Sequence, residues 1–224
     1  MSLPDLALQI AYGRLAWALV AAAVLMALLP AIAQRTKLLI VAALVGWMML
    51  PGAASPAYWL VLAFQYPSGL LTGCAVVSLQ ARWVGRRPRF TLPAGLALGL
   101  AAIGLVMYLD TFGVLALGLY YGGFNPVAAP LLACAAAIGF AINVWRGHAA
   151  GPSAAMLIAV LLFSLLRLPT GNLWDALFDP LLWSWALGSS IVAARRMLTA
   201  RKPSQAPAPV AEPEPQPILA AANE

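Results

Sequence analysis

One group of polar residues lies inside an apolar stretch and could line a path for a small solute or an ion. Gln65, Ser68 and Thr72 occupy positions i, i+3 and i+7, so a helix would place them on one face. Pro67 has no N–H group and would leave the Ala63 carbonyl without its helical partner. A free carbonyl, an amide and two hydroxyls inside a membrane are groups that line the sites of transporters with broken helices.

The same stretch has a second interpretation, as a close contact between helices. Gly69-x-x-x-Gly73 overlaps the polar residues, and small residues at this spacing allow two helix backbones to approach. Polar side chains often support such contacts. Packing is the preferred interpretation and the polar path is the alternative. Two other pairs have the same spacing: Gly95 with Gly99, and Gly118 with Gly122.

A second group of residues could perform acid–base chemistry between the apolar stretches. Asp110 and Asp175 could serve as general acid and general base on a lipid-linked or periplasmic substrate. Arg14 and Arg167 fall on the same predicted side of the membrane, where they could instead form ion pairs with these carboxylates. Asp179 is accounted for by a helix cap. Ion pairing and capping are the preferred interpretation of this charge cluster.

Other kinds of site lack the necessary residues. Cys74 and Cys134 form no Cys-x-x-Cys pair, which argues against thiol–disulfide chemistry. His148 is the only histidine, too few for a His-rich metal site or a bis-histidine haem. No Gly-rich loop with a neighbouring lysine is present to bind phosphates. We therefore expect no metal, no cofactor and no catalytic residue.

The composition predicts a membrane protein. The chain is 63% hydrophobic and 9% charged, whereas soluble domains have about 25% charged residues. The net charge of +6 could suggest nucleic acid as a partner. However, the basic residues flank apolar stretches, where they set orientation and meet anionic lipid headgroups. The expected partners are therefore the lipid bilayer and other membrane proteins, and not nucleic acid.

Seven apolar stretches approach the length of about 20 residues that a membrane-spanning helix needs. All but two of the 13 lysines and arginines gather in four places between or after these stretches. The positive-inside rule then puts the N-terminus outside and the C-terminus inside. The predicted spans are 15–33, 38–54, 57–80, 92–109, 126–145, 152–168 and 180–196.

Local patterns add detail to this topology. Three spans begin with a capping residue before proline, namely Ser55, Asn125 and Asp179. The apolar segment 111–121 would be only about 17 Å long as a helix, which predicts an interfacial or re-entrant segment. Residues 203–224 are rich in proline and are predicted to be a disordered cytoplasmic tail, which leaves residues 1–202 as the membrane domain.

The sequence thus predicts an all-α, polytopic helix bundle with about seven transmembrane helices, in a bacterial inner membrane. The first functional hypothesis is a non-catalytic accessory or structural subunit of a membrane complex, which predicts partners that co-purify with it. The second is a small-solute or ion transporter that uses the kinked third span. The third is an enzyme that uses Asp110 and Asp175 at the outer face.

Overall fold

All regular structure in the described residues is helical, as predicted. The structure is a computed structural model, and it describes residues 4–29, 33–86 and 92–200. The elements are α1 (Leu6–Leu28), α2 (Gln34–Met48), the 3-10 helix η1 (Gly52–Ala54), α3 (Pro56–Phe64), α4 (Gly69–Trp83), α5 (Ala94–Thr111), α6 (Leu119–Gly122), α7 (Ala128–Trp145), α8 (Ala150–Leu166), α9 (Leu173–Leu177) and α10 (Pro180–Ala200).

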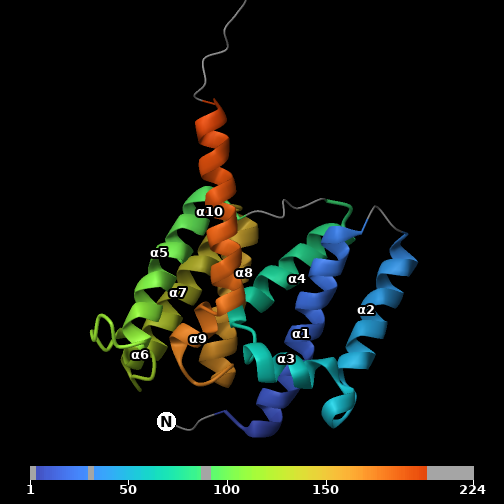
Figure 1. The fold of residues 1–224 in the computed structure, drawn as a ribbon, viewed down its shortest axis with the longest axis horizontal. Helices are drawn as coiled ribbons and strands as arrows, with labels where there is room; N and C mark the ends of the chain where they lie inside the picture. The colour runs from blue at the N-terminus through green and yellow to red at the C-terminus, as the bar shows by residue number, and fades with distance from the viewer. Residues whose placement is uncertain (1–3, 30–32, 87–91, 201–224) are drawn as a thin grey trace, which may run out of the picture.

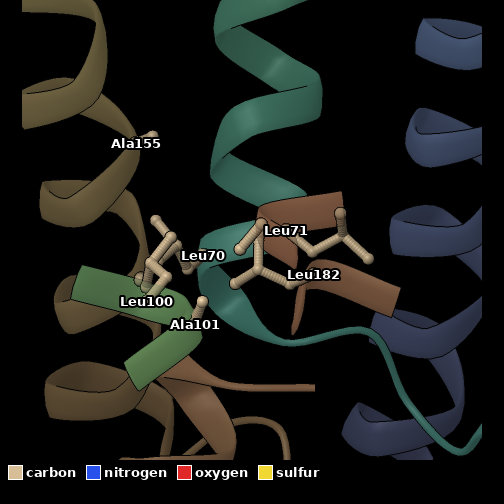
Figure 2. Close-up of a cluster of buried hydrophobic side chains, with 8 residues drawn as sticks. Leu70, Leu71, Leu100, Ala101, Ala155 and Leu182 are labelled. Carbon is tan, nitrogen blue, oxygen red and sulfur yellow. The ribbon is translucent and has the colours of Figure 1, made fainter. Parts of the chain in front are cut away.

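The long helices form a bundle in which neighbours in space differ from neighbours in sequence. The closest pairs are α4 with α8, α7 with α8, α5 with α10, and α1 with both α4 and α2. Figure 1 shows α2 at one edge of the bundle and α5 with α7 at the other. One apolar cluster joins the middle of the bundle. Figure 2 shows Leu70 and Leu71 of α4 beside Leu100 of α5 and Leu182 of α10.

Three helices in the described part of the chain are long and apolar enough to cross a membrane. These are α1, α5 and α7, and α8 is a shorter apolar helix. The predicted third span, 57–80, is not one kinked helix, because α3 ends at Phe64 and α4 begins at Gly69. Gln65 ends α3 with a positive φ of 64°. The helix α6 has four residues, which is too short for a span.

The predicted caps have different outcomes. Asn125 Oδ1 accepts from the amides of Val127 and Ala128 at the start of α7, at 3.0 and 2.8 Å. Asp179 Oδ1 accepts from the amide of Leu182 in α10 at 2.7 Å. The prediction for Asp179 is confirmed. Asn125 bonds amides at the start of α7, but the N-cap residue is Val127 and the helix begins at Ala128, so Pro126 is not its first residue. Ser55 is the N-cap residue of α3 with Pro56 at the helix start, as predicted, but its hydroxyl donates to the Met48 carbonyl at 2.6 Å and makes no cap bond.

The helix ends with basic residues lie together at one end of the bundle, here called the basic end (Figure 1). Arg82 Nη1 donates to the Met26 carbonyl at 2.8 Å, and Lys37 Nζ donates to the Arg82 carbonyl at 3.0 Å. Cations thus lie at the C-termini of α1 and α4, where the helix dipole favours them. The basic end comprises Arg35, Lys37, Arg82, Arg86, Arg146, Arg195 and Arg196; Arg87, Arg89, Arg201, Lys202 and the predicted tail 203–224 lie outside the described residues.

Candidate functional site

The break between α3 and α4 is held by hydrogen bonds from α1. Trp17 Nε1 donates to the Gln65 carbonyl at 3.2 Å, and the Tyr12 hydroxyl donates to the Pro67 carbonyl at 2.8 Å. A chain that leaves helical geometry inside an apolar bundle must satisfy its backbone groups with other protein groups, because lipid offers none. Two aromatic side chains of α1 perform this task, so the break is supported from the neighbouring helix.

A single buried carboxylate joins the start of α4 to the start of α10. Asp179 Oδ2 accepts from the Ser68 amide at 2.9 Å, while its Oδ1 accepts from the Leu182 amide. Asp179 is only 7% exposed. A carboxylate near the N-terminus of a helix is favoured by the helix dipole, and here it serves two helices at once. Asp179 therefore fixes these two helix starts at one point in the bundle.

The four residues of the predicted polar path separate into two environments. The Gln65 side chain is exposed, whereas Pro67, Ser68 and Thr72 are buried. The Ser68 hydroxyl accepts from the Leu71 amide, and the Thr72 hydroxyl lies 2.9 Å from the Ser68 carbonyl and 3.1 Å from the Tyr12 hydroxyl. The buried hydroxyls thus bond within the protein at the break, which is the arrangement expected of structural polar groups.

The neighbouring glycines form the contact between α4 and α8. A Cβ atom on Gly69 would lie 3.0 Å from Ala159 Cα, and one on Gly73 would lie 3.0 Å from Ala155 Cα and closer still to its carbonyl oxygen. The distance at Gly69 is tighter than most real Cβ contacts, and the distance from Gly73 to the Ala155 carbonyl oxygen is shorter than real Cβ atoms show. By contrast, a Cβ atom on Gly95, Gly99 or Gly122 would meet nothing within 4 Å in the described residues.

Only part of the predicted charge cluster comes together at the end of the bundle opposite the basic end. Asp110 accepts from the amides of Leu117, Gly118 and Tyr120 at 2.6, 2.9 and 2.9 Å, so it folds the loop after α5. Asp175 accepts from the Tyr120 hydroxyl at 3.2 Å. Tyr120 therefore brings the two aspartates to one loop cluster, where both bind groups of the protein.

The two arginines of this predicted cluster have other neighbours. Arg14 Nη1 donates to the Met49 carbonyl at 3.4 Å, at the end of α2. The Arg167 guanidinium lies 5.0 Å from the centre of the Phe163 ring, a cation–π distance. In the described part of the chain, no ion pair thus joins Arg14 or Arg167 to Asp110 or Asp175.

Burial makes Asp175 sensitive to pH. Burial raises the pKa of the Asp175 carboxyl, while hydrogen bonds from Thr170 and Tyr120 lower it by less. Burial also raises the pKa of Tyr120 to about 12, so Tyr120 remains a proton donor at neutral pH. A carboxyl whose pKa is higher in the folded state stabilises the fold when it is protonated. That contribution is complete below the unfolded pKa and is lost as the pH rises through the folded pKa.

We expect the melting temperature to decrease as the pH rises from about 4 through the raised pKa of Asp175. The substitution Asp175→Asn should remove much of this decrease, because an amide does not ionise. Thermal unfolding in one detergent across this pH range measures the effect. Asp5→Asn is the control, since Asp5 caps α1 at an exposed position through Ala7. An unchanged pH profile in the Asp175 variant would contradict the prediction.

The largest feature that the sequence did not predict is a cavity of about 1080 Å³ between α1, α4, α5, α8 and α10. Its walls are mostly alanine, valine and leucine, with serines at three positions. Small residues in an apolar helix can mark close packing or open space, and sequence spacing does not distinguish the two. The lining includes Val20, Ala23, Val24, Ala27, Ala75, Val77, Ser78, Leu96, Ala155, Ser184, Ser189 and Ala193.

The cavity runs from the middle of the bundle to the basic end. Its inner limit is formed by Leu71 and Leu181, close to the break and to Asp179. Its other limit includes Arg82 and Arg196. About 16 Å of helix separates Leu71 from Arg82. The cavity is therefore a long apolar space with two cationic side chains at one end.

The residues that line the cavity are apolar, hydroxyl-bearing or basic. Among residues 4–29, 33–86 and 92–200, no group of three or more His, Cys, Asp or Glu could hold a metal ion. The four aspartates of these ranges lie outside the cavity lining. No protein-family model, curated protein or solved structure matches the chain. The described residues thus form an all-helical protein with three apolar candidate spans and a large, partly open cavity between the helices.

Proposed function

We propose that this protein is a non-catalytic integral membrane protein that binds a lipid-like amphiphile in the cavity between α1, α4, α5, α8 and α10. The observation that supports the proposal is the cavity itself, with apolar walls along its length and two arginines at one end. An amphiphile has the matching chemistry, because its apolar part would contact the walls and its polar part would lie at the basic end.

The size of the cavity favours a large apolar ligand. Sites for small molecules usually have volumes of about 300–1,000 Å³, and the cavity has about 1080 Å³. Two of its serines have bonds to the backbone: Ser184 donates to Pro180 O at 2.7 Å, and Ser189 accepts from the Leu92 amide at 3.2 Å. The walls thus offer few groups for a polar solute, and a polar solute would lose hydration without equal compensation.

A non-catalytic role is supported by the partners of the buried carboxylates. Asp110 bonds three backbone amides, and Asp175 accepts from the hydroxyls of Tyr120 and Thr170. A general acid or base needs to reach a proton of the substrate. Both aspartates of the enzyme hypothesis instead bond groups of the loop cluster, which favours a structural role for them.

The proposed topology retains seven crossings, with the broken α3–α4 pair as the third. The positive-inside rule puts the basic end at the cytoplasm of a bacterial inner membrane. In this orientation the end of the cavity that holds Arg82 and Arg196 faces the cytoplasmic leaflet. The ligand would then enter from the leaflet that contains anionic lipids.

A role as an accessory subunit is a second candidate function. Gly95 and Gly99 of α5 meet nothing within 4 Å in the described residues, so this small-residue surface is free for another helix. This second function predicts a protein partner, which purification of the full chain in mild detergent would also detect. Transport along the Gln65 face stays a prediction.

The experiment is native mass spectrometry of the full chain purified in mild detergent. We expect the wild type to retain lipid, and the filled variant Ser78→Phe with Ala193→Phe to lose most of it. Both positions line the cavity. The matched control is Ala135→Phe with Ala141→Phe on the exposed surface of α7, which should retain lipid. Loss of lipid from both double variants, or no retained lipid in the wild type, would contradict the proposal.

A further inference from the structure

We infer that the cavity selects a phospholipid with an anionic headgroup, and that Arg82 and Arg196 bind the headgroup phosphate. This inference rests on the proposed function, since it names the class of ligand for the same cavity. Its basis is the position of the two arginines. Both line the cavity, and both lie on helices that bring them to the basic end.

The bonds of Arg82 leave it able to receive an anion. Its Nη1 donates to the Met26 carbonyl at 2.8 Å, while its Nε is buried without a hydrogen-bond partner in the described residues. Buried polar groups are nearly always hydrogen-bonded, and an unsatisfied donor costs about 1–3 kcal/mol. A phosphate oxygen is a strong acceptor for an arginine N–H group. Nε is enclosed by protein atoms, so an anionic headgroup in the cavity would supply the acceptor that it lacks once the Arg82 side chain turns toward the cavity.

The distribution of charge supports an anion rather than a neutral headgroup. The four carboxylates of the described residues are Asp5, Asp110, Asp175 and Asp179, and none of them lines the cavity. The arginines at the cavity thus have no carboxylate partner among residues 4–29, 33–86 and 92–200. Each cation near a membrane surface attracts anionic lipid by about 1 kcal/mol. Two such cations correspond to a preference of roughly 30-fold.

The occupant is a lipid rather than free phosphate because the polar end is a small part of the site. The cavity continues from Arg82 to Leu71 and Leu181 between apolar walls. Free phosphate would contact only the arginine end and leave this apolar surface uncovered. Burial of acyl chains contributes about 0.8 kcal/mol for each CH₂ group. The apolar walls therefore supply affinity, and the arginines supply selection of the headgroup.

The test places the full chain in mixed micelles with equal amounts of phosphatidylglycerol and phosphatidylcholine and measures retained lipid by native mass spectrometry. The wild type should prefer the anionic lipid by roughly 30-fold. The variant Arg82→Gln with Arg196→Gln should retain lipid with little preference. Arg82→Lys with Arg196→Lys should keep most of the preference, which also shows that the site still folds. Millimolar inorganic phosphate should not displace the lipid.

The matched control is Arg35→Gln with Arg146→Gln, since these exposed arginines belong to the basic end but not to the cavity. It should keep the wild-type preference. If this control loses the preference as fully as the cavity variant, general surface charge explains it and the inference is overturned. Equal retention of both lipids by the wild type overturns the inference but leaves lipid binding intact. Absence of any retained lipid instead removes the proposed function itself.

Discussion

Replacement of Asp179 by alanine is expected to lower the free energy of unfolding by about 3–5 kcal/mol. The carboxylate accepts from the Ser68 and Leu182 amides at 2.9 and 2.7 Å. A hydrogen bond to a charged group contributes about 1.5–3 kcal/mol, and alanine would leave two buried donors without an acceptor. The starts of α4 and α10 would both lose their shared anchor. Denaturation by sodium dodecyl sulfate in mixed micelles measures the change.

Two further variants test whether the expected loss of stability arises because Asp179 bonds the starts of two helices. Asp179→Asn keeps one acceptor but points a donor amide at the second N–H group, so a loss of about 2 kcal/mol is expected. Asp5→Ala removes an exposed cap on α1, where the side chain accepts only from Ala7. That change should cost about 1 kcal/mol or less. A loss in Asp179→Ala no larger than that in Asp5→Ala would refute the shared anchor.

The break in the third span was partly predictable. Pro67 and Ser68 are residues that interrupt a helix and start a new one. Proline alone removes one helical hydrogen bond and therefore predicts only a kink. The full break also needs the positive φ of Gln65 and the bonds from Tyr12 and Trp17. Those bonds come from a distant helix, so no local pattern indicates them.

The aspartates at the end of the bundle opposite the basic end also have bonding partners that residue types alone do not predict. The sequence predicts that Asp110 and Asp175 lie near each other, and Tyr120 bonds both of them. The charges alone also predict an ion pair between Asp110 and an arginine. Backbone amides of the loop after α5 occupy the Asp110 oxygens instead. A turn can present several N–H groups to one carboxylate, and this depends on loop geometry that residue types do not specify.

The cavity could not be predicted because it depends on the distances between helices. The position of its inner limit, however, is related to Asp179, which joins the starts of α4 and α10. Leu71 and Leu181 line the cavity, and they lie close in sequence to the two groups that Asp179 contacts, Ser68 and Leu182. The carboxylate that joins α4 to α10 therefore also defines the depth at which the space between them begins. The same residue links the stability of the fold to the shape of the proposed binding site.

The second large effect is expected from Gly73, where α4 meets α8. A Cβ atom there would lie 3.0 Å from Ala155 Cα and closer to its carbonyl oxygen, so the obstacle is backbone rather than a flexible side chain. Gly73→Ala adds about 1 kcal/mol of helix propensity, but overpacking costs about 1–3 kcal/mol and should exceed it. Gly73→Val adds further atoms and should lower the free energy of unfolding by about 3 kcal/mol or more.

The control for this prediction is Gly99→Ala and Gly99→Val on α5, where a Cβ atom would meet nothing within 4 Å. Alanine at this site should raise stability by up to about 1 kcal/mol, because only the gain in helix propensity remains. The two alanine variants should therefore change stability in opposite directions under the same denaturation measurement. If Gly73→Ala stabilises the protein as Gly99→Ala does, α4 and α8 do not meet at this distance. The cavity wall formed by these two helices would then need a different geometry.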